Sequence, residues 1–263
     1  IRNSYSETID IFDLLADAEK GLDAVNEMLD TGSNQIDFVT ALQKVVDRVE
    51  LLSNQKDNEI CGVTTGFKTL DHFTSGWQDG DLIIIAARPG MGKTALILKN
   101  LLEISLNDGP VGMFSLEMSI VQLAARLVSI NSEFHLSQLI KIGFEKDKYF
   151  HTLMRVQEQM QKLQIYIDDS AGITIHQLQM KARMWKRKYD IKALFVDYIQ
   201  LMSGDNHNES REQEISTITR KLKQLAKELN IPVIALSQLS RKVEDRTDKR
   251  PRLPDLRESG AIE

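Results

Sequence analysis

Cysteine is almost absent from this chain, because Cys61 is the only one among 263 residues. A single thiol cannot close a disulfide within the chain, which excludes the small disulfide-stapled domains that are typical of secretion. Long apolar runs are missing as well. No run approaches the ~20 residues that a membrane-spanning helix needs, and no signal-peptide pattern is present. We therefore expect a cytoplasmic protein that makes no contact with a membrane.

An excess of basic residues is also missing, since the formal net charge is −5. The imbalance is local: residues 1–60 hold 13 acidic and 5 basic side chains, a net −8, whereas the remainder holds 25 acidic and 28 basic side chains, a net +3. A mildly basic remainder permits contact with nucleic acid without indicating it. The length allows one large core, alone or with an appendage.

A phosphate-binding loop is the strongest motif in the sequence. Ala87 to Thr94 read A-R-P-G-M-G-K-T, which is a Walker A pattern with Ala in place of its opening Gly. Gly90 and Gly92 let the backbone turn its N–H groups toward phosphate oxygens, Lys93 adds a positive charge, and the Thr94 hydroxyl is suited to Mg²⁺. Ala is acceptable at the first position wherever φ is negative. The pattern therefore predicts binding of a nucleoside triphosphate.

The surroundings of this loop disfavour the alternative of a chance glycine-rich turn. An apolar strand is expected before the loop and a helix over 94–105 after it, so that the positive end of the helix faces the phosphates. Apolar runs without alternation then recur between helical segments, which is typical of a mostly parallel α/β sheet covered on both faces. The expected strands are 82–87, 111–116, 165–168, 193–198 and 232–237. Capping-box patterns predict helix starts at Ser119, Thr174 and Ser210.

Polar residues follow three of these strands, at the sheet edge where ligands bind in such folds. Glu117 can act as a general base on water, although a Glu favoured by a nearby helix N-terminus is an alternative. Asp197 ends a Walker B strand and is suited to holding Mg²⁺ through water, opposite Thr94. Gln238 can sense the outer phosphate, or it can simply close its strand. Taken together, the three residues favour hydrolysis over passive binding.

Six motifs follow one another along the chain: G-F-K-T-L-D at 66–71, the Walker A loop, S-L-E-M at 115–118, V-D-Y-I-Q-L-M at 196–202, A-L-S-Q-L-S-R at 235–241 and K-R-P-R-L-P-D-L-R-E-S-G-A-I-E at 249–263. Together they resemble the DnaB family of hexameric replicative DNA helicases. The resemblance implies a RecA-like P-loop NTPase core over 61–263 that is C-terminally incomplete. It also implies a helical linker or subunit-docking segment over 1–60. Within that segment, apolar residues at helical spacing predict helices at 9–30 and 36–52, and the first of them can pack on its own domain or dock on a neighbouring subunit.

The resemblance implies roles for individual residues. Lys93 and Thr94 would bind phosphate and Mg²⁺, Glu117 would be the catalytic glutamate, Asp197 the Walker B acid, and Gln238 the residue that couples phosphate state to DNA. Arg257, Glu258 and Gly260 would touch the DNA backbone in the central channel. The residues in contact with ATP would be Ala87, Arg88, Pro89, Gly90, Met91, Gly92, Lys93, Thr94, Ala95 and Arg126.

The activity implied is ATP hydrolysis that drives a homo-hexameric ring along single-stranded DNA and separates the duplex at a replication fork, with a primase and a helicase loader as partners. One alternative is a recombinase-like ATPase that forms filaments on DNA, and another is a scaffold that keeps its nucleotide pocket for assembly only. Two basic stretches, 241–257 and the helix face from Lys181 to Lys188, can each line DNA or form a solvated surface.

Overall fold

The computed structural model describes residues 21, 37–54, 60–132, 134–142, 146–202, 210–240, 243–246, 248–252 and 255–256. The chain divides into two compact units, 1–59 and 60–263. The predicted helix at 9–30 lies outside the described residues apart from Gly21. No helix in the described ranges combines the length and the apolar character that crossing a bilayer requires.

Helix α2, Phe38–Asn54, belongs to the first unit and corresponds to the helix predicted at 36–52. It begins where Asp37 accepts a hydrogen bond from the backbone N–H of Val39, a typical N-terminal cap. Apolar side chains along α2 remain exposed, which is unusual for a helix whose apolar residues recur at helical spacing. They are Phe38, Val39, Leu42, Val45, Val46 and Val49.

The second unit is built on a five-stranded parallel sheet with the order β1-β5-β4-β2-β3. The predicted parallel α/β sheet is therefore confirmed, and each predicted strand lies within one residue of an observed one. The strands are β1 (Leu82–Ala87), β2 (Val111–Ser115), β3 (Ile165–Asp168), β4 (Ala193–Asp197) and β5 (Val233–Gln238). All five carboxyl ends meet at one edge, because the strands are parallel.

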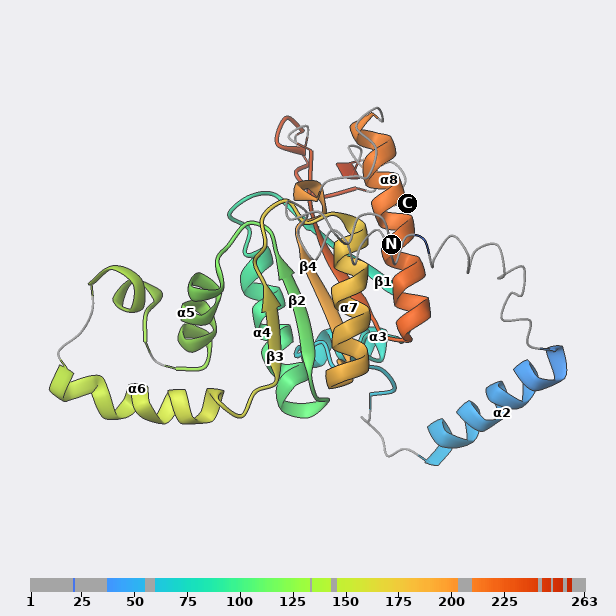
Figure 1. The fold of residues 1–263 in the computed structure, drawn as a ribbon, viewed down its shortest axis with the longest axis horizontal. Helices are drawn as coiled ribbons and strands as arrows, with labels where there is room; N and C mark the ends of the chain where they lie inside the picture. The colour runs from blue at the N-terminus through green and yellow to red at the C-terminus, as the bar shows by residue number, and fades with distance from the viewer. Residues whose placement is uncertain are drawn as a thin grey trace, which may run out of the picture. The chain divides into compact units, whose positions relative to one another are not determined.

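Helices cover both faces of the sheet (Figure 1). Successive strand residues point to opposite faces, so that Met113 and Phe195 pack with α4 and α5, whereas Phe114 and Val196 pack with α7 and α8. The bounds of these helices are α4 (Lys93–Asn107), α5 (Ile120–Ile130), α7 (Ile175–Tyr189) and α8 (Arg211–Leu229). The sheet is thereby held between two buried apolar layers.

The three predicted capping boxes are all formed. The side chains of Ser119, Thr174 and Ser210 each accept a hydrogen bond from the backbone N–H of the Gln three residues later. The side chain of that Gln in turn accepts a hydrogen bond from the backbone N–H of the cap residue. These caps fix where α5, α7 and α8 begin. Four elements were not expected from the sequence. They are α3 (Lys68–Thr74), the π-helical turn η2 (Gln138–Ile142), α6 (Lys146–Met160) and a short 3₁₀ turn after β4, η3 (Ile199–Leu201).

Candidate active site

The phosphate-loop segment joins the end of β1 to the start of α4. Gly90 and Gly92 have φ values of 79° and 87°, in the left-handed region that favours glycine, and Gly92 is the N-cap of α4. A Cβ placed on either glycine would meet nothing within 4 Å. Glycine is therefore required here by the backbone conformation, and open space remains beside the loop for an anion at the helix N-terminus.

Lys93, the first residue of α4, is half-buried at this loop. Its Nζ donates a hydrogen bond to the carbonyl oxygen of Ser237 at 3.3 Å and lies 5.1 Å from the ring centroid of Tyr198. Burial lowers the pKa of Lys93 from its ordinary value, while the negative charges of Asp197 and Glu117 act in the opposite direction. The charges of both predicted carboxylates therefore act on the ammonium group.

Asp197 is fully buried at the end of β4. Its Oδ2 accepts a hydrogen bond from the Thr94 hydroxyl at 3.1 Å, whereas its Oδ1 is buried and has no hydrogen-bond partner among the described residues. Burial raises the pKa of Asp197, and nearby Glu117 raises it further, although the Thr94 hydrogen bond and Lys93 oppose this. A hydroxyl and a carboxylate with an unpaired oxygen are the donor set that Mg²⁺ accepts beside a phosphate.

Glu117 lies two residues beyond the end of β2, before Ser119, the N-cap of α5. It is therefore outside the first turn of α5, where a carboxylate that merely complements the helix dipole is expected. The turn is held by the buried Ser115 hydroxyl, which donates to the Met118 carbonyl oxygen at 2.7 Å, and by the Leu116 N–H, which donates to the Asp197 carbonyl oxygen at 2.7 Å. Glu117 itself is exposed.

The order of the strands brings the predicted residues to one place. Glu117, Asp197 and Gln238 follow or end β2, β4 and β5, which are adjacent in the sheet, and Gln238 is paired in register with Ala87 at the start of the loop. Arg126 of α5 presents a buried Nε that has no hydrogen-bond partner in the described ranges, and its charge opposes the rise that burial causes in the pKa of Asp197.

Two residues at this edge make contacts that were not predicted from the sequence. Tyr198 places its ring against Lys93, and its position directly after the Walker B acid was the available signal. Arg88 was predicted only as a nucleotide contact. Its guanidinium also donates to the Leu239 carbonyl oxygen at 2.9 Å and to the Glu244 carboxylate at 2.7 Å, which ties the loop to the segment after β5.

The predicted DNA contacts Arg257, Glu258 and Gly260 lie outside the described residues. In the described part of the 241–257 stretch, two basic residues have acidic partners. Arg246 forms an ion pair with Asp255, and Arg252 lies 3.5 Å from Asp248. These pairs reduce the positive charge that the stretch can offer to DNA.

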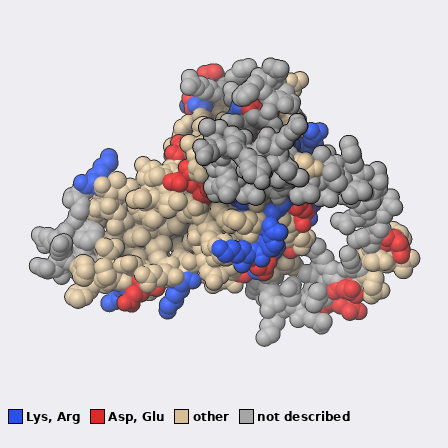
Figure 2. Space-filling model, viewed as in Figure 1, with Lys and Arg blue, Asp and Glu red and all other residues tan. Residues whose placement is uncertain are grey.

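The basic face of α7 is visible as lysine and arginine side chains near the centre of Figure 2. Three of its five cations form ion pairs. Lys181 pairs with Asp168, Arg183 with Glu228, and Lys186 with Asp190. The structure therefore favours a solvated, internally paired helix face.

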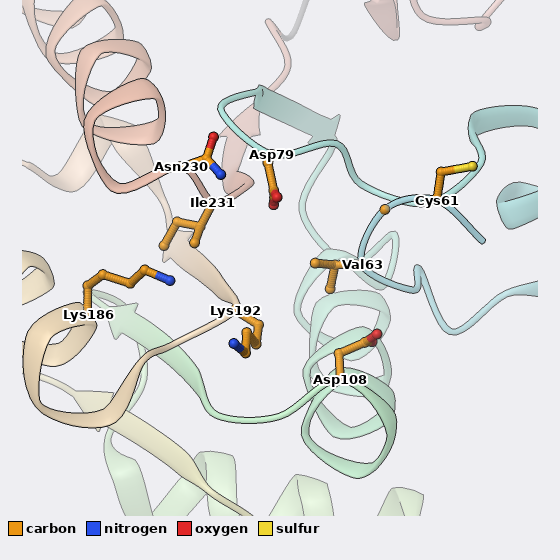
Figure 3. A pocket seen from close by; sticks show the side chains of 9 residues that line it. Cys61, Val63, Asp79, Asp108, Lys186, Lys192, Asn230 and Ile231 are labelled. Carbon is orange, nitrogen blue, oxygen red and sulfur yellow. The ribbon is translucent and has the colours of Figure 1, made fainter. Parts of the chain in front are cut away.

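A cavity of about 310 Å³ lies at the opposite edge of the sheet (Figure 3). Its lining includes Asp108, Lys192 and Ile231, which precede β2, β4 and β5, so the cavity is at the amino ends of the strands. Lys186 and Lys192 face Asp79 and Asp108 across it, and none of the phosphate-loop residues contributes. This cavity is therefore separate from the edge that carries the candidate site.

Comparison with known proteins gives a consistent result. The family model described as "DnaB-like helicase C terminal domain" matches residues 62–263. Replicative DNA helicase DnaC of Bacillus subtilis (strain 168) and replicative DNA helicase DnaB of Geobacillus stearothermophilus are each 39% identical over 264 residues, covering 100% of this chain and 58% of the relative. The chain thus spans just over half the length of these relatives.

Solved structures agree with the sequence comparison. One solved structure, of an ATPase domain, superposes with a TM-score of 0.80 at 38% identity and covers 86% of this chain and 80% of that one. The structure of a DnaB-like replicative helicase and its interactions with primase gives a TM-score of 0.79 at 36% identity, with 95% and 60% coverage. The RecA-like fold predicted from the motifs is therefore confirmed.

Proposed function

The chain belongs to the DnaB-like helicases, since residues 62–263 match their C-terminal domain, and from this premise we propose that it is the ATP-driven motor of a hexameric replicative DNA helicase. The observation that carries the proposal is the meeting of Lys93, Thr94, Asp197 and Glu117 at one sheet edge, with an unpaired oxygen on Asp197. A scaffold that only binds nucleotide has no need for Glu117 beside a metal-binding pair.

Nucleotide binding is assigned to the loop and its flanks, Ala87 to Ala95. Backbone N–H groups around Gly90 and Gly92 hold the phosphates, and Lys93 neutralises their charge. Thr94 and Asp197 hold Mg²⁺, which when bound neutralises charge on the outer phosphates. Arg126 offers its unpaired Nε to the same charge.

Hydrolysis follows from the position of Glu117. Its carboxylate takes a proton from a water molecule as the water oxygen bonds to the γ-phosphorus, and the bond from that phosphorus to the bridging oxygen of ADP breaks. The turn held by Ser115 and Leu116 keeps Glu117 beside Asp197. Gln238, at the end of β5, then passes the phosphate state to DNA contacts that we assign to Arg257, Glu258 and Gly260.

Assembly into a homo-hexamer is part of this proposal. Residues 1–60 act as the linker that docks on a second copy, and 61–263 act as the ATPase domain. The exposed apolar side chains of α2 support this assignment, because an amphipathic helix gains stability by covering such a stripe.

Leu42→Asp is expected to weaken the assembly, because a carboxylate in the apolar stripe of α2 must be desolvated at any interface that buries it. We expect the hexamer fraction at micromolar concentration to fall about 10-fold or more, as measured by analytical ultracentrifugation. Gln43→Glu adds the same charge at the neighbouring exposed position, at the cost of one hydrogen bond to Asp47 within α2, and is the control. An unchanged hexamer fraction in Leu42→Asp would show that α2 is not the docking element.

Three partners are part of the same proposal. Single-stranded DNA is the track. A primase is proposed because a similar solved protein is described with its primase interactions, and a loader is proposed because a closed ring must be opened around DNA. A cytoplasmic location fits relatives that are bacterial replication proteins.

The function is tested with the full-length protein. Hydrolysis of ATP stimulated by single-stranded DNA, unwinding of a forked duplex, and closed six-membered rings in electron micrographs are the expected results. Filaments on DNA without unwinding would favour the recombinase alternative, which the helicase relatives do not support. Nucleotide binding without hydrolysis would point to the scaffold.

A further inference from the structure

The side chain of Gln200 links the segment after β4 to the end of the neighbouring strand β5. It lies in η3, directly after the Walker B strand β4, and its side-chain amide reaches the end of the neighbouring strand β5. Nε2 donates to the Ser237 hydroxyl at 2.8 Å and to the Gln238 carbonyl oxygen at 3.4 Å, while Oε1 accepts from the Gln238 N–H at 3.3 Å. One amide thus uses both its donor and its acceptor on the last two residues of β5.

The backbone carbonyl of Gln200 is bound by the first residue of α8. Arg211, the first residue of α8, donates from Nη2 to the Gln200 carbonyl oxygen at 2.6 Å and to the Met202 carbonyl oxygen at 3.2 Å. Its Nη1 also contacts Glu214. Arg211 therefore joins η3 to the N-terminus of α8 across the interval between Met202 and Ser210.

These contacts form a continuous path from the phosphate loop to α8. Lys93 donates to the Ser237 carbonyl oxygen, Ser237 and Gln238 are bound by the Gln200 amide, and the Gln200 backbone is bound by Arg211. A triphosphate beside the loop competes for the Lys93 ammonium, so nucleotide occupancy changes the first contact of the path. A chain of hydrogen bonds of this kind can carry energetic coupling between two sites.

We propose that Gln200 is a positioning residue that couples nucleotide state at the phosphate loop to DNA occupancy, acting through Ser237 and Gln238 on one side and Arg211 on the other. The inference rests on the proposed function, since it assumes that DNA and ATP affect one another in this protein. The Gln200 amide is bound to Ser237 and Gln238, so we place its effect on coupling and not on either binding site alone. Because coupling is reciprocal, DNA changes nucleotide affinity by the same factor as nucleotide changes DNA affinity.

Gln200→Met tests the proposal, because Met has a similar length but lacks the amide that makes all three contacts. In the full-length, assembled protein we expect the rate of ATP hydrolysis without DNA to stay within about 3-fold of the wild-type rate. The stimulation of that rate by single-stranded oligothymidine should fall about 3- to 30-fold. The difference in oligothymidine affinity between a non-hydrolysable ATP analogue and ADP should shrink by a similar factor. Gln224→Met, an exposed change on α8, is the control.

The outcomes separate the two hypotheses. A wild-type protein whose hydrolysis does not respond to DNA contradicts the proposed function itself. A wild-type response that Gln200→Met retains, or a variant in which both rates fall in equal proportion, overturns the role of Gln200. Should Gln200→Met fail to fold, Arg211→Lys gives the second measurement. The guanidinium binds Glu214 with Nη1 and both carbonyl oxygens with Nη2, and the single ammonium nitrogen of Lys cannot hold all three partners in this way. Its control is Arg220→Lys on the same helix, which should leave the stimulation unchanged.

Discussion

Glu117→Gln is expected to lower the rate of ATP hydrolysis about 10²- to 10⁴-fold, the usual contribution of a general base. The amide has nearly the same size as the carboxylate but cannot take a proton from water. The turn around residue 117 should survive, since it is held by Ser115 and by backbone contacts that the substitution does not touch.

Nucleotide affinity should change much less than the rate. The groups assigned to hold the nucleotide are the loop, Lys93 and the Thr94–Asp197 pair, and Glu117 is not one of them. Loss of its negative charge removes repulsion from the triphosphate, so affinity should rise if it changes at all. Single-turnover hydrolysis and equilibrium binding of a fluorescent ATP analogue separate the two effects. Glu158→Gln, at an exposed position of α6, is the matched control. A Glu117→Gln protein with the wild-type rate would show that another group activates the water.

Much of this site could be predicted from the sequence, because its residues are defined by local pattern. The phosphate loop needs glycine at φ values near 80°, and Gly90 and Gly92 stand where the motif requires them. Asp197 was assigned to the place opposite Thr94 because apolar runs marked two buried parallel strands. The observed hydrogen bond between the two side chains agrees with that expectation.

The path through Gln200 could not be predicted in the same way. Ser237 and Arg211 are separated from Gln200 by 37 and 11 residues, and the contact with Ser237 exists only because β5 lies next to β4 in the sheet. Strand order is set by the packing of helices on the two faces, which local periodicity does not record. The ion pairs on the basic face of α7 could not be predicted for the same reason, because the partners Asp168 and Glu228 come from β3 and α8.

Asp197→Asn is expected to reduce activity and to increase stability. The neutral amide weakens the hold on Mg²⁺, so Mg²⁺-dependent hydrolysis should fall about 10- to 100-fold, as for other groups that orient a metal through water. In the protein without Mg²⁺ or nucleotide, however, Asp197 is a buried carboxylate whose pKa is raised by burial and whose Oδ1 has no partner among the described residues. A raised pKa means that the charged form destabilises the folded state at pH 7.

Replacing Asp197 with Asn should therefore raise the free energy of unfolding by about 1 kcal/mol or more, the typical cost of an unsatisfied buried group. Asp168→Asn is the control with the opposite sign. Burial alone would raise the pKa of Asp168, but hydrogen bonds from Lys181 and Ser170 lower it, so its charged form stabilises the fold at pH 7. Thermal unfolding without Mg²⁺ should give a higher Tm for Asp197→Asn and a lower Tm for Asp168→Asn, with hydrolysis reduced only in the former. A lower Tm in Asp197→Asn would mean that its hydrogen bond with Thr94 outweighs the cost of the buried charge, and the site would then be built for stability as well as for Mg²⁺.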